Sequence, residues 1–351
     1  MATDLALGLQ ARGHQVSVAC LRGGGPLAEV LQQSHAEICS LEKGEGFSIR
    51  SLRGFVNFLK DRKVDVVHTH NPLTHHYGVL AGRMAKVPFV VNTFHGPGNL
   101  TGFGKTQLIF EASCLFSSRV VACCQSVEHH LQRVTRVARR KLTMIPNGIA
   151  LDRFTSIRAT PHDGELVLGA VGRLVPVKDH ASLLDAFASV LRTQPMCRLE
   201  ILGEGPLGTR LREKAEALGI ANRVVFRGAS LDVVSFLAGL DIFVLCSLSE
   251  GLPLTLIEAM AAALPVVGTS VGEIPNLVKA SNCGWVCSPG NPKELAAALL
   301  EAARANDRHQ RGIRAREYVL SRYSVHLMVE SYQTLFEQLL RSNCVRNAPT
   351  A

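Results

Sequence analysis

The sequence predicts an α/β protein with two Rossmann-like domains, each a parallel sheet covered by helices on both faces. Short apolar, β-branched runs alternate with helical stretches along the whole chain, as in parallel sheets buried on both sides. This pattern occurs twice, and the polar stretch SIRATPHDGEL at 156–166 separates the two copies. The length of 351 residues and the hydrophobic content of 47% are enough for two packed cores.

The apolar runs place six strands in each half. We expect strands at 15–21, 36–41, 64–70, 87–95, 119–124 and 141–148, and then at 166–174, 198–205, 223–228, 241–247, 265–270 and 283–288. The first 15 residues, MATDLALGLQARGHQ, already read as a helix and its exit. In the last helix, at about 325–341, four residues at helical spacing form an apolar stripe that should pack on a domain surface, namely Met328, Tyr332, Leu335 and Leu339.

These elements define the expected domains. Residues 1–160 form an N-terminal Rossmann-like domain, and residues 161–325 form a C-terminal Rossmann-like domain. A helix at 326–342 and a tail at 343–351 follow. In open α/β sheets ligands bind outside the carboxyl ends of the strands, so two domains with facing strand ends would form a cleft.

The charge distribution is asymmetric. The net charge is +9, and residues 1–160 carry all of it, with 19 Lys and Arg against 10 Asp and Glu. A basic half attracts anions such as nucleic acid, acidic lipid head groups or phosphorylated substrates. Its densest run is RVTRVARRK at 133–141, which fits either a solvated helix face or an anionic surface contact.

Other sequence features indicate a cytoplasmic protein. The N-terminus lacks the basic and apolar regions of a secretory signal, and no apolar run reaches the ~18 residues that span a bilayer. The ten cysteines have no zinc-finger spacing, which is typical of reduced thiols. Peripheral contact of the basic half with the inner membrane face is compatible with these features.

Two motif-like stretches are interpreted as non-functional. GFGKT at 102–106 lacks the first glycine of a P-loop, because Asn99 stands there. In HTHNPLTHH we expect His68 and His70 to point to opposite faces of a strand, so capping and hydrogen bonding are favoured over a metal site. His95 differs, because it ends an apolar strand before GPG and should project from the strand end, either as a structural residue or toward a substrate.

The loop GEGPLG at 203–208 fits the dinucleotide pattern G-x-G-x-x-G after a strand. A nicotinamide site also requires an acid near the end of the next strand, but that strand ends in Arg227 and Gly228. We interpret the loop as a tight turn with backbone amides facing a ligand. Another strand end, VGRLVPVK, presents Arg173 and Lys178, a forked donor and a point charge that suit a diphosphate.

The stretch SEGLPLTLIEAM at 249–260 contains two acids, Glu250 and Glu258, in an otherwise apolar segment. Gly251 permits close backbone approach, and Pro253 suits the first position of a helix whose amino end attracts anions. This order places a sugar at Glu250, phosphates at the helix amides and the vicinal hydroxyls of a ribose at Glu258.

Together these motifs resemble the retaining glycosyltransferases of family 4, which have the GT-B architecture. The resemblance rests on VNTFHG, IPNGI, VGRLVPVKDH, ILGEGP, SEGLPLTLIEAM and VGEIPNLV, in family order over nearly the whole chain. It implies a hexosyltransferase that uses a UDP- or GDP-sugar without a metal, since there is no Asp-x-Asp motif. The N-terminal domain would bind the acceptor, a glycan or a lipid-linked sugar in glycan, polysaccharide or glycolipid synthesis, and the C-terminal domain would bind the nucleotide-sugar. The C-terminal helix would cross back to the N-terminal domain.

The resemblance also implies roles for individual residues. Arg173 and Lys178 would neutralise the diphosphate, while Glu250 and His95 would contact the donor sugar; these four are the expected catalytic residues. Front-face displacement with retention would follow, with the leaving diphosphate helping to deprotonate the acceptor hydroxyl. The expected donor contacts are Gly172, Arg173, Lys178, Gly203, Gly205, Gly228, Glu250, Gly251, Leu252, Pro253, Leu254, Thr255 and Glu258.

The sequence departs from the family pattern in two places. Some relatives have glycine where Pro253 stands, so one amide donor is absent here. We also expect the family's first strand and glycine-rich loop to be missing before residue 1, either because the start was assigned downstream of the real one or because the protein is truncated. Their loss would leave strand edges unpaired. We therefore expect this form to be poorly active or unstable, and soluble expression with full turnover would contradict that expectation.

Two alternative functions fit parts of the sequence. An NAD(P)-dependent oxidoreductase would use GEGPLG, and a fluorescence titration with dinucleotide would test it. A non-catalytic protein that binds anions or nucleic acid would use the basic half, although no RNA-binding aromatic motif is evident. Salt-dependent heparin retention without donor hydrolysis would favour it, and we expect no nucleic-acid partner.

Overall fold

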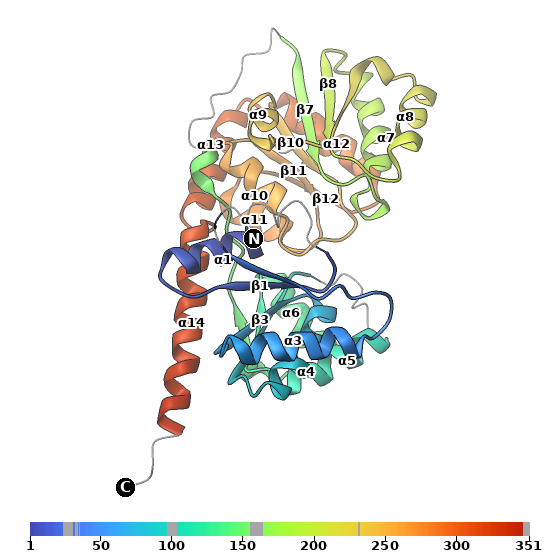
Figure 1. The fold of residues 1–351 in the computed structure, drawn as a ribbon. Coiled ribbons are helices and arrows are strands. Elements are labelled where there is room, and N and C mark those ends of the chain that lie inside the picture. The colour runs from blue at the N-terminus through green and yellow to red at the C-terminus, as the bar shows by residue number, and fades with distance from the viewer. Residues whose placement is uncertain are drawn as a thin grey trace. The chain divides into compact units, whose positions relative to one another are not determined.

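A computed structural model of the chain shows an α/β protein with parallel sheets (Figure 1). It describes residues 1–23, 31, 34, 36–96, 104–154, 164–230 and 232–346, with side chains to 342. Two compact units are present: unit 1 is Met1–Gly148 with Val325–Ala351, and unit 2 is Ile149–Ser324. Every strand pair in both units is parallel, which confirms the predicted fold class.

The boundary between the two units lies at other residues than those predicted from the sequence. The first boundary lies after Gly148, earlier than 160, because the short 3-10 helix η2 (Leu151–Phe154) contacts helix α10 (Leu254–Ala261) of unit 2. The expected linker at 156–166 falls mostly outside the described residues, as do the first two residues of GFGKT and the end of the tail, 347–351.

Unit 2 contains one six-stranded sheet with the order β12-β11-β10-β7-β8-β9. The chain begins at the centre with β7, proceeds outward to β9, and returns to place β10 on the other side of β7. This reversal is a topological switch point, where open sheets bind ligands at the carboxyl ends of the strands. The strands are β7 (Leu166–Val171), β8 (Cys197–Leu202), β9 (Val224–Gly228), β10 (Ile242–Leu245), β11 (Val266–Thr269) and β12 (Gly284–Cys287).

Helices cover both faces of the unit 2 sheet. The core on one face joins Leu168 of β7 and Leu199 of β8 to Phe187 of α7 and Leu299 of α12, all without exposed surface. On the other side α13 packs against α10 and α11. Besides α10, the helices are α7 (His180–Leu191), α8 (Gly208–Ala217), α9 (Val233–Ala238), α11 (Ile274–Ser281), α12 (Pro292–Arg304), α13 (Arg308–Leu320) and two 3-10 turns, η3 (Pro176–Lys178) and η4 (Ala221–Arg223).

The strands of unit 1 lie in two parallel sheets. One sheet has four strands in the order β3-β4-β5-β6, and the other pairs β1 with β2. The strands of this sheet follow one another in chain order. Because all of them pair in parallel, their carboxyl ends lie along one edge. The strands are β1 (Ser17–Cys20), β2 (Glu37–Ser40), β3 (Val66–His70), β4 (Phe89–Phe94), β5 (Arg119–Ala122) and β6 (Leu142–Met144).

Two helix layers cover the four-stranded sheet of unit 1. Val90 of β4 packs with α3 and α4, while its neighbour Val91 packs with α1 and α14, because successive strand residues face opposite sides. The predicted stripe on the last helix is confirmed, since its four residues are at most 6% exposed. The helices are α1 (Ala2–Ala11), α3 (Ile49–Asp61), α4 (Pro72–Met84), α5 (Lys105–Leu115), α6 (Gln125–Val134), α14 (Val325–Arg346) and the 3-10 turn η1 (Arg139–Lys141).

All twelve predicted strands are present, with ends that differ by a few residues. Among the helices that the structure describes, none is both long and apolar enough to cross a membrane.

Candidate functional site

Three loops at the carboxyl ends of β7, β8 and β9 are bonded to one another. The amide of Gly203 donates to the carbonyl of Gly228 at 2.7 Å, and the amide of Leu174 donates to the carbonyl of Glu204 at 2.9 Å. The amide of Gly172 donates to Leu202 at 2.9 Å. These bonds hold three of the expected donor-contact glycines, Gly172, Gly203 and Gly228, in one backbone platform beside the switch point.

Gly203 is required by this platform. Its φ is +145°, and a Cβ at this residue would overlap the carbonyl oxygen of Gly172. The glycine pattern of GEGPLG therefore serves contact between two loops. At the end of the next strand, Arg227 donates to the buried carboxylate of Glu200 at 2.8 and 3.0 Å, so a basic group stands where a dinucleotide site would need an acid. This arrangement does not favour the oxidoreductase alternative.

Lys178 and Glu250 are brought together across the switch point. Lys178 ends η3 after β7, and Glu250 follows β10. The Lys178 Nζ lies 2.5 Å from the Glu250 Oε1, and the Ser247 hydroxyl donates to the same oxygen at 2.6 Å. The two charged side chains are only 21% and 12% exposed. From the sequence we expected Lys178 and Glu250 each to contact the ligand, but we did not predict the ion pair between them.

The backbone at Glu250 is held from behind by the loop after β11. The amide of Glu273 donates to the carbonyl of Gly251 at 3.0 Å. Glycine is required at position 272, where φ is +55°, because the Cβ of any other residue would lie 2.5 Å from the carbonyl oxygen of Glu250. The VGE turn at 271–273 therefore fixes the direction in which the Glu250 side chain leaves the backbone.

Helix α10 begins directly after this turn. The sequence predicted Pro253 at the first helical position, but it is the N-cap residue, so the helix begins one residue later, at Leu254. The amides of Leu256 and Ile257 bond to the carbonyl of Pro253, at 3.2 and 3.3 Å. The first two amides, of Leu254 and Thr255, precede any helical acceptor and carry the positive end of the helix dipole. An anion such as a phosphate is stabilised at this position.

Glu258 lies one turn further along α10 and is half-buried. Burial raises the pKa of its carboxyl, and the positive charge of Arg153 in η2 opposes this shift. Within the described residues its carboxylate has no ion pair or side-chain hydrogen bond. A desolvated acceptor of this kind can receive hydrogen bonds from two vicinal hydroxyls.

Arg173 is exposed at the end of β7, and in the described part of the chain it forms no ion pair. It lies five residues before Lys178, on the loop that also holds Leu174 against the GEG turn. The guanidinium is thus free to move onto an anion, whereas Lys178 is already engaged by Glu250.

His95 belongs to unit 1, where it directly follows β4. Its Nε2 lies 3.0 Å from Nδ1 of His70, and the Asn147 amide nitrogen lies 3.4 Å from its Nδ1. With Asn147 donating to Nδ1, the His95 proton is on Nε2 and is donated to His70, which then carries its own proton on Nε2. Burial lowers the pKa of His95 to about 4, so this pair is neutral near pH 7.

The prediction that His68 and His70 point to opposite faces was wrong. Their ring centroids are 4.5 Å apart, because residues two apart on a strand share a face. His68 bonds to the Thr93 hydroxyl at 2.7 Å, which in turn bonds to the hydroxyl of Tyr332 at 2.7 Å. Among the described residues, no three His, Cys, Asp or Glu side chains are grouped to hold a metal ion.

Sequence reasoning missed three polar partners of the site. Ser247 supports Glu250, while His70 and Asn147 occupy both ring nitrogens of His95. The signal for Ser247 was its place three residues before Glu250, at a strand end. Asn147 was visible only as part of the PNG turn after β6, and its contact with His95 depends on strand pairing.

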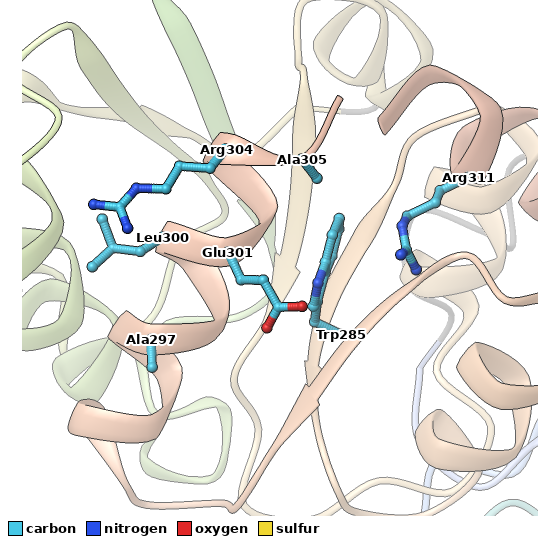
Figure 2. Close-up of a pocket in the computed structure, with 7 residues that line it drawn as sticks. All are labelled: Trp285, Ala297, Leu300, Glu301, Arg304, Ala305 and Arg311. Carbon is cyan, nitrogen blue, oxygen red and sulfur yellow. The ribbon is translucent and has the colours of Figure 1, made fainter. Parts of the chain in front are cut away.

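A depression on unit 2 lies away from these residues. Figure 2 shows its lining from α12, β12 and α13, including Trp285, Glu301, Arg304 and Arg311. The guanidinium of Arg311 lies 4.5 Å from the centre of the Trp285 ring and covers it. None of the predicted site residues contributes to the lining.

Two family models match the chain. Residues 152–318 match the model described as glycosyl transferases group 1, and residues 1–153 match the model described as glycosyltransferase family 4. The two matches together extend over both units.

Individual relatives agree with these matches. An N-acetyl-alpha-D-glucosaminyl L-malate synthase from Bacillus anthracis is 30% identical over 52% of this chain and 48% of the relative. The UDP-Gal:alpha-D-GlcNAc-diphosphoundecaprenol alpha-1,3-galactosyltransferase of Escherichia coli is 28% identical over 72% of this chain and 70% of the relative. The chain therefore spans about half of the first of these relatives and about two thirds of the second.

Solved structures share the fold. The crystal structure of Anabaena HepE in complex with UDP-glucose superposes with a TM-score of 0.80 at 20% identity, covering 97% of this chain and 94% of HepE. At this identity the likeness concerns the fold alone.

Proposed function

Because the chain belongs to the family 4-like glycosyltransferases with the GT-B fold, we propose that it moves a sugar from a nucleotide-diphosphate sugar to a hydroxyl acceptor with retention of configuration. The observation that carries this proposal is the arrangement at the β10–α10 junction. Among the described residues, a lysine–glutamate pair, a helix amino end without a side-chain cap and a half-buried carboxylate without an ion pair follow one another there. These groups match, in order, the sugar, the diphosphate and the ribose of such a donor.

Each group has a chemical role in donor binding. Lys178 and Arg173 neutralise the diphosphate together with the amides of Leu254 and Thr255. Glu258 accepts hydrogen bonds from the two ribose hydroxyls. Glu250 accepts hydrogen bonds from the hydroxyls of the transferred sugar, which requires Lys178 to turn from the carboxylate toward the phosphate.

In the transfer step, the bond from the anomeric carbon to the phosphate oxygen breaks while the acceptor oxygen bonds to the same carbon. The acceptor proton passes to an oxygen of the leaving diphosphate on the same face, which preserves the configuration. Lys178, Arg173 and the dipole of α10 stabilise the charge that develops on the leaving group.

We assign His95 of unit 1 the role of a neutral hydrogen-bonding group for a sugar hydroxyl. Both of its ring nitrogens are engaged, so a sugar hydroxyl must replace one partner. The bond with Asn147 is the longer, at 3.4 Å, and is the one expected to exchange.

The comparisons support a UDP-sugar donor and a glycan or lipid-linked acceptor. HepE binds UDP-glucose, and the relative from Escherichia coli acts on a diphosphoundecaprenol-linked sugar. By analogy we place the protein in cell-surface glycan, polysaccharide or glycolipid synthesis, in the cytoplasm at the inner face of the membrane.

The test measures nucleotide diphosphate release with a panel of UDP- and GDP-sugars, and the anomeric configuration of the product by NMR. Glu258→Ala and Lys178→Ala should each lower turnover at least tenfold. Glu301→Ala, which removes a carboxylate of unit 2 outside the site, is the control and should keep activity. Full activity of the first two variants, or an inverted product, would contradict the proposal.

A further inference from the structure

Helix α5 of unit 1 turns an apolar face outward. Leu108, Ile109, Leu115 and Phe116 are 62%, 47%, 70% and 52% exposed, and Ala112 lies exposed between them. Their spacing of three and four residues places them on one side of the helix. We call these five residues the α5 face. Surface helices normally direct such a stripe toward the core.

The opposite side of α5 is firmly packed, so the orientation of the helix is fixed. Phe110 and Cys114 are 0% and 2% exposed, and the rings of Phe110 and Phe94 of β4 lie 5.4 Å apart. The buried Ser117 hydroxyl, just after the helix, lies 2.8 Å from Nε2 of the buried His75. A rotation of α5 that buried the apolar face would break these contacts.

Cations from three other elements surround the end of the α5 face. The guanidinium of Arg83, at the end of α4, lies 4.4 Å from the centre of the Phe116 ring. The Lys141 Nζ donates to the carbonyls of Cys114 and Leu115, at 3.1 and 2.7 Å. Burial lowers the pKa of Lys141, and the charges of Arg140 and Arg119 lower it further.

Acidic residues do not balance this charge on α5. Its one acid is Glu111, and the side chain of Gln107 donates to it at 2.8 Å. Arg136, Arg139 and Arg140 in the run before β6 are all exposed. The region therefore combines exposed apolar side chains with a positive border, the combination found on proteins that lie on anionic membranes.

We propose that the α5 face docks on a bilayer that contains anionic phospholipids. Leu115 and Phe116 enter the boundary between head groups and acyl chains, and the surrounding cations contact lipid phosphates. The eleven residues of α5 span ~16 Å, so the whole helix can lie in the plane of the interface. Charge complementarity favours an anionic membrane over an apolar protein surface as the partner. Both the dense basic run at 133–141 and the net charge of +9 on residues 1–160 attract an anionic lipid surface.

The docking surface leaves the site of unit 1 open. Arg119 begins β5 and Lys141 precedes β6, so the cations lie at the amino ends of the strands. His95 lies past the carboxyl end of β4, at the opposite edge. The proposal deepens the proposed function by placing the unit that would bind a lipid-linked acceptor at the lipid surface. Membrane binding itself requires no donor and is measured without one.

The experiment is co-sedimentation of the full chain with vesicles of phosphatidylcholine alone or with 40% phosphatidylglycerol. Binding should require the anionic lipid and fall steeply between about 50 and 500 mM salt. Leu115→Ser with Phe116→Ser should weaken binding about tenfold or more. Arg139→Gln with Arg140→Gln should weaken it about 25-fold, at about fivefold for each cation.

Met196→Ser is the matched control, because Met196 is an apolar side chain of unit 2 that is 54% exposed. This variant should bind vesicles like the wild type. Thermal unfolding verifies that each variant is folded, as expected for surface positions. Equal binding of wild type and both double variants would overturn the proposal. The proposal would also be overturned if light scattering showed that the wild type is a dimer, and that Leu115→Ser with Phe116→Ser is a monomer with unchanged vesicle binding. Loss of sugar transfer with vesicle binding intact would instead contradict only the proposed function.

Discussion

Replacing Glu250 with glutamine tests whether the Lys178–Glu250 pair competes with a nucleotide. In the ligand-free protein, the Lys178 ammonium and the Ser247 hydroxyl both bond to one oxygen of Glu250, at 2.5 and 2.6 Å. A diphosphate must draw Lys178 away from this carboxylate. Glutamine keeps the shape and an acceptor oxygen but removes the charge, so Lys178 should be more available to a phosphate in Glu250→Gln.

The size of the effect follows from the exposure of the pair. Both side chains retain some solvent contact, at 21% and 12%, so the pair lies between a surface and a buried salt bridge. Such a pair contributes about 1–2 kcal/mol, which is below the cost of breaking a fully buried one. Releasing it should tighten the binding of UDP or GDP about 5- to 30-fold. Sugar transfer should fall at the same time, because the sugar hydroxyls lose their charged acceptor.

Isothermal titration calorimetry with UDP and with GDP measures the binding, and diphosphate release measures turnover. A double-mutant cycle provides the internal control, since Glu250→Gln should have little effect on nucleotide binding in a Lys178→Ala background. Glu301→Gln removes a carboxylate from unit 2 outside the site and should leave affinity unchanged.

Folded Glu250→Gln that binds the nucleotide as weakly as the wild type, or more weakly, would contradict this prediction. The same conclusion follows if its gain in affinity persists when Lys178 is alanine. Either result would mean that the ion pair does not restrain Lys178.

Three further predictions concern the stability of the units. Gly203→Ala should lower the free energy of unfolding by about 3 kcal/mol or more in urea denaturation, because the alanine Cβ would overlap the carbonyl oxygen of Gly172. Gly219→Ala is the control: this residue also has a positive φ but lies in open space, so the free energy of unfolding should fall by only about 1 kcal/mol. The depressed pKa of His95 means that this residue binds more protons in the unfolded state between pH 4 and 6.5, so its contribution to stability should be full above pH 6.5 and fall by about 1–2 kcal/mol on acidification to pH 5. Burial also lowers the pKa of His68, His70, His75 and His180, which add to the total pH dependence. His95→Gln should therefore reduce the slope by the His95 contribution, and an unchanged slope would count against a neutral buried imidazole. Tyr332→Phe should destabilise unit 1 by about 1 kcal/mol through loss of the bond to Thr93, while Tyr318→Phe, which keeps a half-exposed ring, should be neutral.

The sequence was sufficient to predict the strands of unit 2, and it placed the candidate ligand loops at strand ends. Continuous apolar runs ended at GRLVPVK, GEGPLG and SEGLPL, and strand ends are where such sheets bind ligands. The stripe on the last helix was equally visible, since one-face helical spacing persists whatever the stripe packs against. The domain boundary after Gly148 was less visible, because η2 joins unit 2 through contacts with α10 that have no local signature.

The sequence by itself determined the fold class and the residue types at each strand end, because hydrophobic periodicity and turn chemistry are local properties of the chain. Tertiary structure decided which of those side chains meet. Lys178 and Glu250 are 72 residues apart and pair only because β7 and β10 are neighbours in the sheet. His95 meets His70 and Asn147 through the pairing of β3 to β6, and the outward apolar face of α5 depends on what its other side packs against. Contacts of this kind depend on strand order and helix rotation, which a local pattern does not specify.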